Sequence, residues 1–357
     1  MSRVAIIGAG IGGLTTAIGL QRRGWDVSVF ERSGANSQVG AGLSLFGNGF
    51  RALDAVGAGD AVRAIAGPPQ RLTTGQRRRD GRWLATTAHS LISELRVVHR
   101  ADLHRVLTDE LEPGTVTYGK EVDGPLDGFD VVVAADGLRS PTRGTAIRYS
   151  GYTSWRGVTT RPVDLLGGAG ESLGRGERFG LAPLPDGRVY WFGVVSMPAG
   201  TPFPDEFAEV RRRFASWHAP IAEVLDATDP AAVVRTDIHD LAKPLPSFVM
   251  GSVVLLGDAA HAMTPDLGQG ANMAIEDAAT LTCVLSTLPI KDAIAAYDEI
   301  RRPRTQAVAR KARLMGRLLQ SRNPLRDVLL RLTPPSVTAR QLTALQQWSP
   351  PEVTLAA

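Results

Sequence analysis

Several features that mark particular classes of protein are scarce or absent in this sequence. It has a single cysteine, Cys283, so no internal disulfide can form, and the apolar helical pattern around it predicts an unreactive core position. No stretch reaches the roughly 18 consecutive apolar residues that a membrane-spanning helix requires. The glycines at positions 8, 10, 12 and 13 interrupt the apolar N-terminal stretch, which argues against a secretory signal. We therefore expect a cytoplasmic protein that does not interact with membranes.

The net charge is also low, which limits the partners that the sequence suggests. There are 40 basic and 36 acidic residues, a formal charge of +4. The densest basic cluster, Arg77 to Arg79, is followed by Asp80 and Gly81, and this pattern predicts a solvated turn. We expect no nucleic-acid partner, and no metal site is predicted. A length of 357 residues with 43% hydrophobic residues is ordinary for a globular protein with room for two domains.

The first part of the chain has the pattern of a βαβ unit. Residues Arg3–Ile7 and Asp26–Phe30 are short β-rich runs, and Gly13–Arg23 between them has apolar residues at helical spacing. The sequence then predicts a helix over about Asn48–Ile65, a strand-like region through Arg82 and Trp83, a helix from about Arg100 and a buried strand at Phe129–Ala134. Together these elements predict an α/β fold with a parallel sheet.

The later part of the chain changes in character and then changes back. Residues 151–249 form short β runs separated by turns, which predicts a second, mainly β domain. Val253–Leu256 is again a buried strand, and long helices follow it to about Leu319, so the chain returns to its first domain. Residues 321–357 predict only a short helix and a tail. The connection between Leu111 and Asp130 leaves room for a reduced β hairpin.

The first strand and helix enclose a dinucleotide-binding motif. Gly8, Gly10 and Gly13 form the pattern G-x-G-x-x-G, with Gly12 inside it, in the strand–turn–helix context that the motif requires. The glycines let the backbone approach a pyrophosphate, and the helix N-terminus offers free N–H groups to it. Glu31 ends the second strand, where a carboxylate can accept hydrogen bonds from the adenosine ribose. The motif alone fits FAD and NAD equally, because both contain ADP.

Later segments distinguish between these cofactors. Val131–Arg143 reads VVVAADGLRSPTR and Val253–Asp277 reads VVLLGDAAHAMTPDLGQGANMAIED, and each is a buried strand that leads into a loop. The pattern Y-x-x-x-R-x-P-R follows at Tyr297–Arg304, and Val98–Leu103 begins a helix with VHRADL. In this order the segments resemble the fingerprints of the flavoprotein aromatic hydroxylases, the family of para-hydroxybenzoate hydroxylase. The resemblance extends over about residues 1 to 315 and is to the compact, single-component branch.

This resemblance implies a Rossmann-like FAD-binding domain of the glutathione-reductase type, with an inserted, mainly β substrate domain and C-terminal helices. The FAD-binding domain is then formed by residues 1–67, 98–150 and 250–320, the substrate domain by 68–97 and 151–249, and a C-terminal helix and tail by 321–357. It further implies tight, non-covalent FAD, transient NADPH or NADH, and O2. A flavin C4a-hydroperoxide would transfer one oxygen atom to a small aromatic substrate. Hydroxylation, epoxidation and Baeyer–Villiger oxidation stay open, as do monomer and homodimer.

The same resemblance assigns residues to the flavin. Asp258, at a strand end, would accept hydrogen bonds from the ribityl hydroxyls, and a helix from about Asn272 would direct its positive end at the flavin pyrimidine. Arg100 is the cation expected near the ribityl chain or pyrophosphate. His261, in a tight turn, is predicted to be a packed structural histidine rather than an acid or base. The other positions expected beside FAD are Arg32, Ala41, Gly42, Asp136, Gly137, Arg143, Gly257, Pro265, Gly268, Gly270 and Ala271.

No side chain is assigned as catalytic, because the flavin carries the chemistry; Pro265, Gly268, Gly270 and Asn272 are expected near its isoalloxazine ring. Asp136 and Arg143 would also serve the approach of NAD(P)H. The substrate pocket is expected between the β domain and the flavin, with Trp155, Arg156, Arg178, Phe179, Tyr190 and Phe192 as candidates. Strand alternation places Tyr190 and Phe192 on one face and Trp191 on the other, without indicating which face lines the pocket. Either arginine could bind a carboxylate or phenolate, or be structural.

Two alternatives stay open at this point. The first is another FAD-dependent enzyme on the same fold, such as a reductase, an oxidase or a halogenase, although the W-x-W-x-I-P motif of halogenases is missing. The second is a non-catalytic FAD-binding redox protein. Steady-state oxidation of NAD(P)H separates the second alternative from an enzyme, because a carrier does not turn over.

Overall fold

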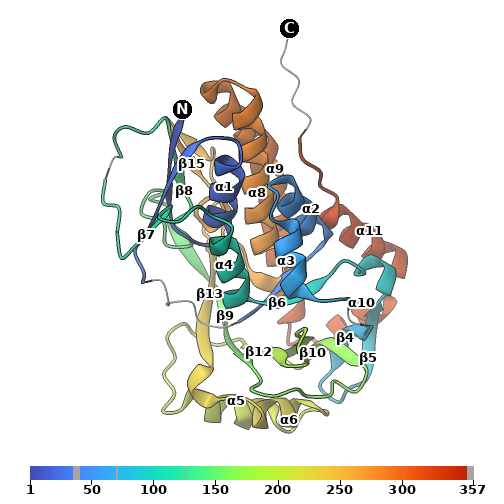
Figure 1. Ribbon diagram of the computed structural model, residues 1–357. Coiled ribbons are helices and arrows are strands. Elements are labelled where there is room, and N and C mark those ends of the chain that lie inside the picture. Colours follow the sequence, from blue (N-terminus) through green and yellow to red (C-terminus); the bar gives the residue numbers. More distant parts are fainter. Residues whose placement is uncertain (35–40, 70, 125, 352–357) are drawn as a thin grey trace.

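The computed structural model describes residues 1–34, 41–69, 71–124 and 126–351 (Figure 1). Its strands form a six-stranded, a seven-stranded and a two-stranded sheet. In this part of the chain, no helix combines the length and the apolar character that crossing a membrane requires. The two large sheets correspond to the α/β and the mainly β regions that the sequence predicts.

The six-stranded sheet brings distant parts of the chain together. It consists of β1 (Arg3–Ile7), β2 (Asp26–Glu31), β7 (Val116–Tyr118), β8 (Val131–Ala134), β14 (Val249–Met250) and β15 (Val253–Leu255). Their order is β14-β15-β8-β1-β2-β7, and only the pair β14 and β15 is antiparallel. Because β1, β8 and β15 are parallel neighbours, the loops that follow them lie at one edge of the sheet.

Long helices cover this sheet (Figure 1). They are α1 (Ile11–Gln21), α2 (Gly47–Ala55), α3 (Gly59–Ala66), α4 (Arg100–Asp109), α8 (Gly270–Thr287) and α9 (Ile290–Leu319). The helix α8 lies between α1, α2 and α9 and contacts all three. It is buried over most of its length, which suits its mixture of alanines and aliphatic residues. The central helix of this layer therefore begins beside the loops at the sheet edge.

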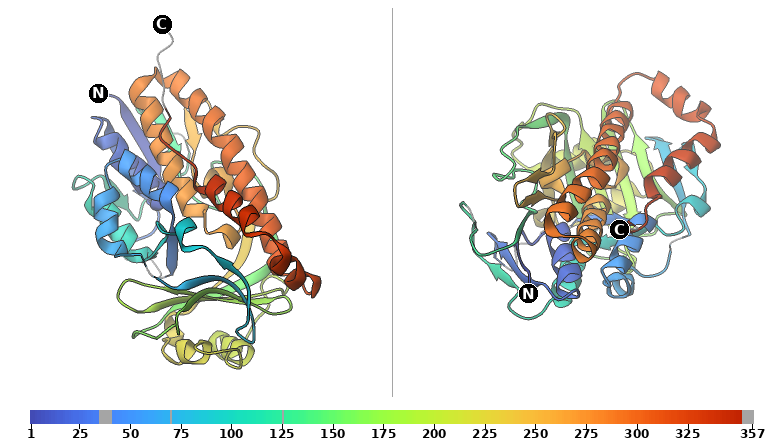
Figure 2. Two further views of the ribbon diagram at one scale, coloured as in Figure 1. Left: turned by 90° about the vertical axis from the view of Figure 1, so that its right-hand side faces the viewer. Right: turned by 90° about the horizontal axis from the view of Figure 1, so that it is seen from above.

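The seven-stranded sheet forms the second layer. It consists of β4 (Thr73–Arg78), β5 (Trp83–Thr87), β9 (Ile147–Val158), β10 (Gly168–Leu173), β11 (Glu177–Pro183), β12 (Val189–Val195) and β13 (Val234–Leu241), in the order β13-β9-β12-β11-β10-β4-β5. One face packs on α5 (Glu206–Phe214) and α6 (Ile221–Asp226), as Figure 2 shows in its left view. Trp155, Phe179, Trp191 and Phe214 fill the core between them. The other face of the sheet is turned toward the six-stranded layer.

Shorter elements join the two layers. They are β3 (Gly42–Leu45), β6 (Arg96–His99), α7 (Asp258–His261), the 3-10 helices η1 (His89–Leu91), η2 (Pro230–Ala232) and η3 (Pro265–Leu267), and the helices α10 (Leu325–Leu332) and α11 (Pro335–Gln346). Strands β3 and β6 pair with each other. Helix α10 contacts β5, whereas α11 contacts α2 and η1. The C-terminal helices therefore extend from one layer to the other.

Three predictions about single elements were wrong. The expected helix over Asn48–Ile65 is two helices, because Gly57 between them has φ of +84°, a conformation that ends α2. Between Leu111 and Asp130, the described residues contain β7, which pairs in parallel with β2, and no hairpin. The C-terminal region forms two helices instead of one short helix, because the apolar residues of α10 and α11 pack against distant elements.

Two side chains also differ from expectation. Arg77 is not in a solvated turn: it lies in β4, is buried, and stacks on Trp83 with 4.6 Å between guanidinium carbon and ring centroid. Only the residues after it form the turn. Cys283 lies on α8 as expected but is only partly buried, and burial raises the pKa of its thiol. A raised thiol pKa agrees with the expectation of low reactivity.

Candidate functional site

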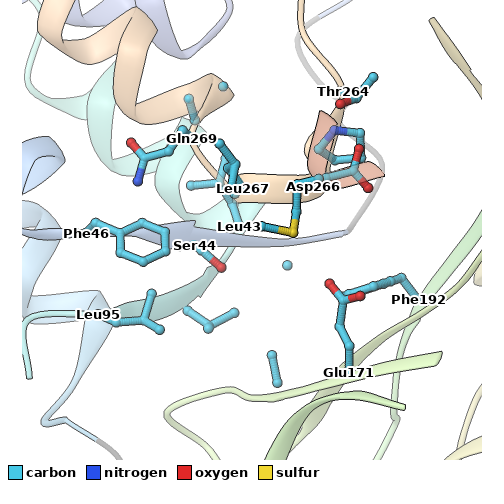
Figure 3. Close-up of a pocket in the computed structure, with 18 of the residues that line it drawn as sticks. Leu43, Ser44, Phe46, Leu95, Glu171, Phe192, Thr264, Asp266, Leu267 and Gln269 are labelled. Carbon is cyan, nitrogen blue, oxygen red and sulfur yellow. The ribbon is translucent and has the colours of Figure 1, made fainter. Parts of the chain in front are cut away.

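A cavity of about 980 Å³ lies between the two layers. The glycine-rich loop after β1, strand β3 and the loops after β8 and β15 form one side of it, and the open face of the seven-stranded sheet forms the other. Figure 3 shows this space: Glu171 rises into it from the sheet, and Asp266 and Leu267 of η3 project from the opposite side. The cavity is large enough for a cofactor and a small molecule.

The glycine-rich loop has the shape of a phosphate cradle. A Cβ atom added to Gly10 would meet nothing within 4 Å, so open space adjoins the backbone there. At Gly13 an added Cβ would collide with the carbonyl oxygen of Gly8, which has φ of +103°. Helix α1 begins at Ile11 and presents its unpaired N–H groups at the same place. These features fit the pyrophosphate of a dinucleotide.

Glu31 and His104 shape the loop from behind. The Glu31 carboxylate accepts hydrogen bonds from the Ala9 backbone N–H at 2.9 Å and from the Ser33 N–H at 2.8 Å. Nε2 of His104 on α4 lies 2.8 Å from the Ala9 carbonyl oxygen. His104 was not predicted from the sequence, and its position four residues after Arg100 in a helix is the only signal. Arg32 is exposed beside this loop.

Most residues predicted beside the flavin line the cavity together. The list comprises Gly10, Gly12, Gly13, Ala41, Gly42, Arg100, Gly137, Gly257, Asp258, Pro265, Gly268, Gly270 and Ala271. They come from the start of β3, the start of α4, and the loops and first helical turns that follow β1, β8 and β15. Small residues predominate, so the backbone can approach a flat ring closely. The fit to FAD is therefore good at both its pyrophosphate and its ring end.

Arg143 and Asn272 contact neighbouring backbone instead of lining the cavity. Arg143 is buried and donates hydrogen bonds to the carbonyl oxygens of Leu138, Asp258 and Ala259. Asn272 is buried as well, accepting from the Phe46 N–H and donating to the Ser44 and Gly268 carbonyls, each at 3.0 Å. The Arg143 guanidinium is thus held by backbone carbonyls and does not line the cavity. Both side chains fix the loops that do face the cavity.

Asp136 lies just outside the cavity wall. One carboxylate oxygen, Oδ2, accepts a hydrogen bond from the Thr142 hydroxyl at 2.8 Å. The other, Oδ1, is buried and has no hydrogen-bond partner among the described residues. An unpartnered buried carboxylate oxygen is costly, so a donor from a bound ligand would stabilise this loop.

Helix α8 directs its N-terminus at the cavity. It begins at Gly270, two residues before the predicted start near Asn272, and Gly268 before it has a left-handed φ of +62°. The first turn contains no acidic residue that would offset its positive end. Its dipole therefore favours negative charge in the adjoining space.

Behind this helix, a buried ion-pair network ties α8 to α9. Arg301 donates to Glu276 and Asp277, with distances of 2.7 Å to each carboxylate. His261, predicted to be structural, is buried with Nε2 2.5 Å from Asp277 Oδ2. Burial alone would raise the pKa of Asp277, but His261 and Arg301 lower it to about 2. The motif Y-x-x-x-R-x-P-R is thus a structural tie rather than a direct cavity contact.

At the substrate end, strand β12 divides its side chains between cavity and core. Tyr190 and Phe192 line the cavity, whereas Trp191 is fully buried on the other face. The ring of Phe192 covers Gly180 on β11 and the ring of Tyr190 covers Gly42 on β3, where an added Cβ would collide with them. The alternation predicted from sequence is present, and the cavity face is the one with Tyr190.

Two of the six substrate candidates are core residues. Trp155 and Phe179 are both 0% exposed and do not line the cavity. Trp155 donates from Nε1 to Glu206 of α5 at 2.7 Å, and Phe179 stacks on Trp191 with centroids 5.5 Å apart. They occupy the sheet face covered by α5 and α6, which sequence alternation alone could not identify.

Arg178 is a buried cation between two carboxylates. Its guanidinium donates to Glu171 at 3.1 Å and to Asp266 at 2.5 Å, and Asp266 also accepts from the Tyr152 hydroxyl at 2.5 Å. Because both carboxylates neutralise it, Arg178 is not free to bind a substrate anion. Burial raises the pKa of Glu171; Arg178 opposes this effect and Asp266 adds to it. Among the described residues, no donor reaches the second carboxylate oxygen of Glu171, Oε1.

Arg156 is the other cation on the cavity face. It lies on β9 directly opposite Phe192 of β12 and lines the cavity. Within the described parts of the chain it forms no ion pair, and its buried Nε has no hydrogen-bond partner. Its charge lowers the pKa of Tyr190, which burial raises. Of the two predicted arginines, Arg156 is therefore the one available to a ligand.

Glu171 and Asp266 were missed at the sequence level. Asp266 stands inside the quoted loop VVLLGDAAHAMTPDLGQGANMAIED, and an acidic residue after Pro265 was a signal that could have been read. Glu171 had no such signal in the sequence, because its place in the site depends on which face of the sheet meets the cavity. A C-terminal helix was predicted, but not that residues from α10 and α11 would line the cavity.

Comparisons with known proteins agree with this geometry. A family model described as an FAD binding domain matches residues 129–312, and one described as an FAD dependent oxidoreductase matches residues 3–120. The chain is 35% identical to the aurachin C monooxygenase/isomerase of Stigmatella aurantiaca, over 92% of this chain and 94% of that protein. It is 33% identical to an FAD-dependent urate hydroxylase of Klebsiella pneumoniae, over 87% and 88% respectively.

The structural similarity extends over both layers. The crystal structure of Klebsiella pneumoniae HpxO complexed with FAD and uric acid matches with a TM-score of 0.86 and 29% identity, covering 97% of this chain and 96% of that one. The similarity therefore includes the two sheets and the C-terminal helices.

Proposed function

Because the chain belongs to the flavoprotein aromatic hydroxylases, which are FAD-dependent monooxygenases, we propose that its substrate is a small, uncharged aromatic or heteroaromatic ring. One oxygen atom of O2 would enter this ring, with NADPH or NADH as the reductant. We further propose that the product is hydroxylated, that NAD(P)H binds only transiently, and that the protein acts in the cytoplasm as a monomer or homodimer.

The described residues fit FAD. The glycine-rich loop and the N-terminus of α1 would hold the pyrophosphate, Glu31 would fix the turn beside the ribose, and Arg100 and Asp258 would bind the ribityl region. Strand β3 and the loop before α8 would enclose the ring. When bound, FAD supplies the electron transfer and the activation of O2. The protein's own task is to bind, orient and shield the reactants.

The observation that carries the substrate class is the charge balance at the substrate end. Glu171, Asp266, Arg178 and Arg156 all line the cavity there, and their formal charges cancel. A net-neutral wall with aromatic side chains favours a neutral ring over an anion. Oε1 of Glu171 can accept a hydrogen bond from a ring N–H or O–H, and Arg156 can donate to a carbonyl or hydroxyl oxygen.

Glu171 can also take a proton from the substrate. Burial raises the pKa of its carboxyl, which brings it toward the range in which a carboxylate accepts protons from phenols or ring N–H groups. Removal of that proton raises the electron density of the ring, which makes its carbon more reactive toward an electrophilic oxygen. Tyr190 and Phe192 would hold the ring in place while Leu267 and Phe46 exclude water.

The test is NAD(P)H oxidation by the FAD-loaded protein with isotopically labelled O2. A panel of phenols, hydroxypyridines, purines and quinones is compared with benzoates, and the product masses are recorded. We expect a neutral compound to stimulate NAD(P)H oxidation and to gain one labelled oxygen atom. A dehydrogenated product without label would instead establish a different FAD-dependent oxidoreductase. Failure of the purified protein to turn over NAD(P)H at all would favour a non-catalytic redox protein.

A further inference from the structure

The cavity continues beyond the ring-binding residues along the C-terminal helices. On this side most of the lining is apolar, and we call its apolar part the C-terminal wall: Met315 and Leu318 of α9, Leu329 and Leu330 of α10, and Val337 and Leu342 of α11. The polar lining residues of this stretch are Thr333, Thr338, Gln341 and Gln346. Figure 2 shows these last helices crossing from the long helix α9 to the edge of the seven-stranded sheet. A ring bound beside Glu171 would leave this extension of the cavity unfilled.

The surface opposite the C-terminal wall carries no formal charge. It is formed by β4 and β5, whose cavity-lining residues include Thr74, Gln76, Ala85 and Thr87. Of the charged groups of the substrate end, Glu171 lies on β10, the strand next to β4, and Arg156 lies on β9, three strands beyond β10. An occupant of this part of the cavity is therefore selected by apolar burial and not by ion pairing.

The C-terminal wall is held at its ends by hydrogen bonds. Arg326 of α10 donates to the carbonyl oxygens of Gly174 and Leu319 at 2.7 and 3.0 Å, and Arg304 of α9 donates to the Leu345 carbonyl of α11 at 3.0 Å. Between these ties, the buried apolar residues belong to small clusters separate from the two large cores. The hydrogen bonds therefore hold α10 and α11 in place, and only small apolar clusters pack between them.

The wall also opens to solvent. Leu329 lines the cavity and is 54% exposed, so that a chain lying along it can extend outward. Leu325, Val328 and Leu332 continue the apolar stripe of α10 but do not line the cavity. Leu329 thus marks the entrance to the cavity, because it belongs both to the apolar stripe of α10 and to the cavity lining.

We propose that this part of the cavity is a subsite for an apolar chain, an alkyl or similarly unbranched substituent carried by the aromatic ring. The inference rests on the proposed function, because it assumes that the ring lies beside Glu171. It goes further in assigning a second recognition element. The ring is selected by hydrogen bonds at the sheet, and its substituent is selected by apolar contact with α9, α10 and α11.

Binding of phenol, 4-propylphenol and 4-heptylphenol to the FAD-loaded protein tests this subsite by calorimetry. Each methylene that becomes buried should lower Kd by about fourfold, equivalent to ~0.8 kcal/mol. Leu329→Gln, and independently Leu342→Gln, should weaken 4-heptylphenol about tenfold and leave phenol unchanged. Leu325→Gln is the matched control, because Leu325 lies on the same helix, is 66% exposed and does not line the cavity.

Two outcomes would overturn the subsite. One is an affinity that does not change with chain length; the other is a loss in Leu325→Gln equal to that in Leu329→Gln, which would mean non-specific adsorption to the stripe. Labelled-oxygen incorporation is recorded with the same compounds. If affinity rises with chain length but no ring gains labelled oxygen, the result supports the subsite and contradicts the proposed function. If a ring gains labelled oxygen but affinity does not change with chain length, the result supports the proposed function and contradicts the subsite.

Discussion

The molecule contains two arginines that are buried between pairs of carboxylates, one in each layer. Arg301 lies between Glu276 and Asp277, and all three side chains are 0% exposed. Arg178 lies between Glu171 and Asp266, but the Glu171 side chain is 20% exposed and faces the cavity. The set around Arg301, which also includes Arg304 and His261, is therefore closed to the cavity, whereas the set around Arg178 is open to it.

The difference shows in the acidity of the carboxylates. Asp277, which contacts Arg301 and His261 and has no access to the cavity, has its pKa lowered to about 2. Glu171, which shares one arginine with Asp266, has its pKa raised. A carboxylate with a lowered pKa stays ionised and stabilises the fold, whereas one with a raised pKa can exchange a proton. The closed set is thus suited to structure and the open set to chemistry.

Removing the cation from the closed set should have the largest effect. Arg301→Met leaves Glu276 and Asp277 buried with one partner fewer each, and we expect a loss of about 3–5 kcal/mol in the free energy of unfolding. Chemical denaturation of the FAD-loaded protein measures it. Arg310→Met is the control, because Arg310 is exposed on the same helix and should change stability by less than about 0.5 kcal/mol. Equal losses in both variants would contradict the structural role of Arg301.

Neutralising the open set should affect turnover more than stability. Glu171→Gln keeps a side chain of the same size but cannot take a proton, so kcat/KM should fall about 100-fold. In the wild type kcat/KM should rise with pH as Glu171 ionises, and this rise should disappear in the variant. The affinity for FAD should stay unchanged. Glu299→Gln, an exposed position on α9, serves as the control. A pH profile that keeps its rise in Glu171→Gln would assign the proton transfer elsewhere.

The lowered pKa of Asp277 predicts a particular dependence of stability on pH. Its folded pKa of about 2 lies below the ordinary value of 3.8, so its contribution is complete above about pH 4 and is lost as the pH falls through 2. Because this ionic contribution is lost in Asp277→Asn, we expect its free energy of unfolding above pH 4 to be about 2 kcal/mol lower than that of the wild type. The gap between the two proteins should narrow toward pH 2. A gap independent of pH would show that the contribution of Asp277 is not ionic.

Substitutions on the two faces of the seven-stranded sheet should have the smallest effects on stability and on KM. Phe179→Leu, in the core, should cost about 1 kcal/mol of stability and leave KM unchanged. Phe192→Leu, on the cavity face, should raise KM about fivefold, equivalent to ~1 kcal/mol of ring contact, and leave stability unchanged. Thermal unfolding and steady-state kinetics measure the pair. If Phe179→Leu changed KM and Phe192→Leu did not, the assignment of the two faces would be reversed.

How far the sequence could predict the molecule depended on the range of the interactions. The loop at Gly8–Gly13 was predictable because its conformation and its helix are set by adjacent residues, and the β8 and β15 strands because their apolar runs are continuous. For Trp155 and Phe179, the strand pattern predicted that successive side chains point to opposite faces of the sheet. It did not predict which face is the core, because α5 and α6, which cover that face, lie far along the chain.

Longer-range features were beyond the sequence. Glu171 and Asp266 are 95 positions apart and meet only through Arg178, so neither has a local signature as a site residue. The apolar spacing of α10 could indicate a helix, but its partners lie on β5 and α9. These features could not be predicted because the sequence does not show how the two layers lie relative to each other.

The glycines beneath Phe192 and Tyr190 have a consequence for how enzymes of this type diversify. A methyl group at Gly180 would push the Phe192 ring forward, and one at Gly42 would displace Tyr190. Either change would alter the shape available to a substrate without replacing any side chain that touches it. Selection for a smaller or differently shaped substrate could therefore act at Gly180, which does not itself line the cavity, and a search confined to the visible lining would overlook it.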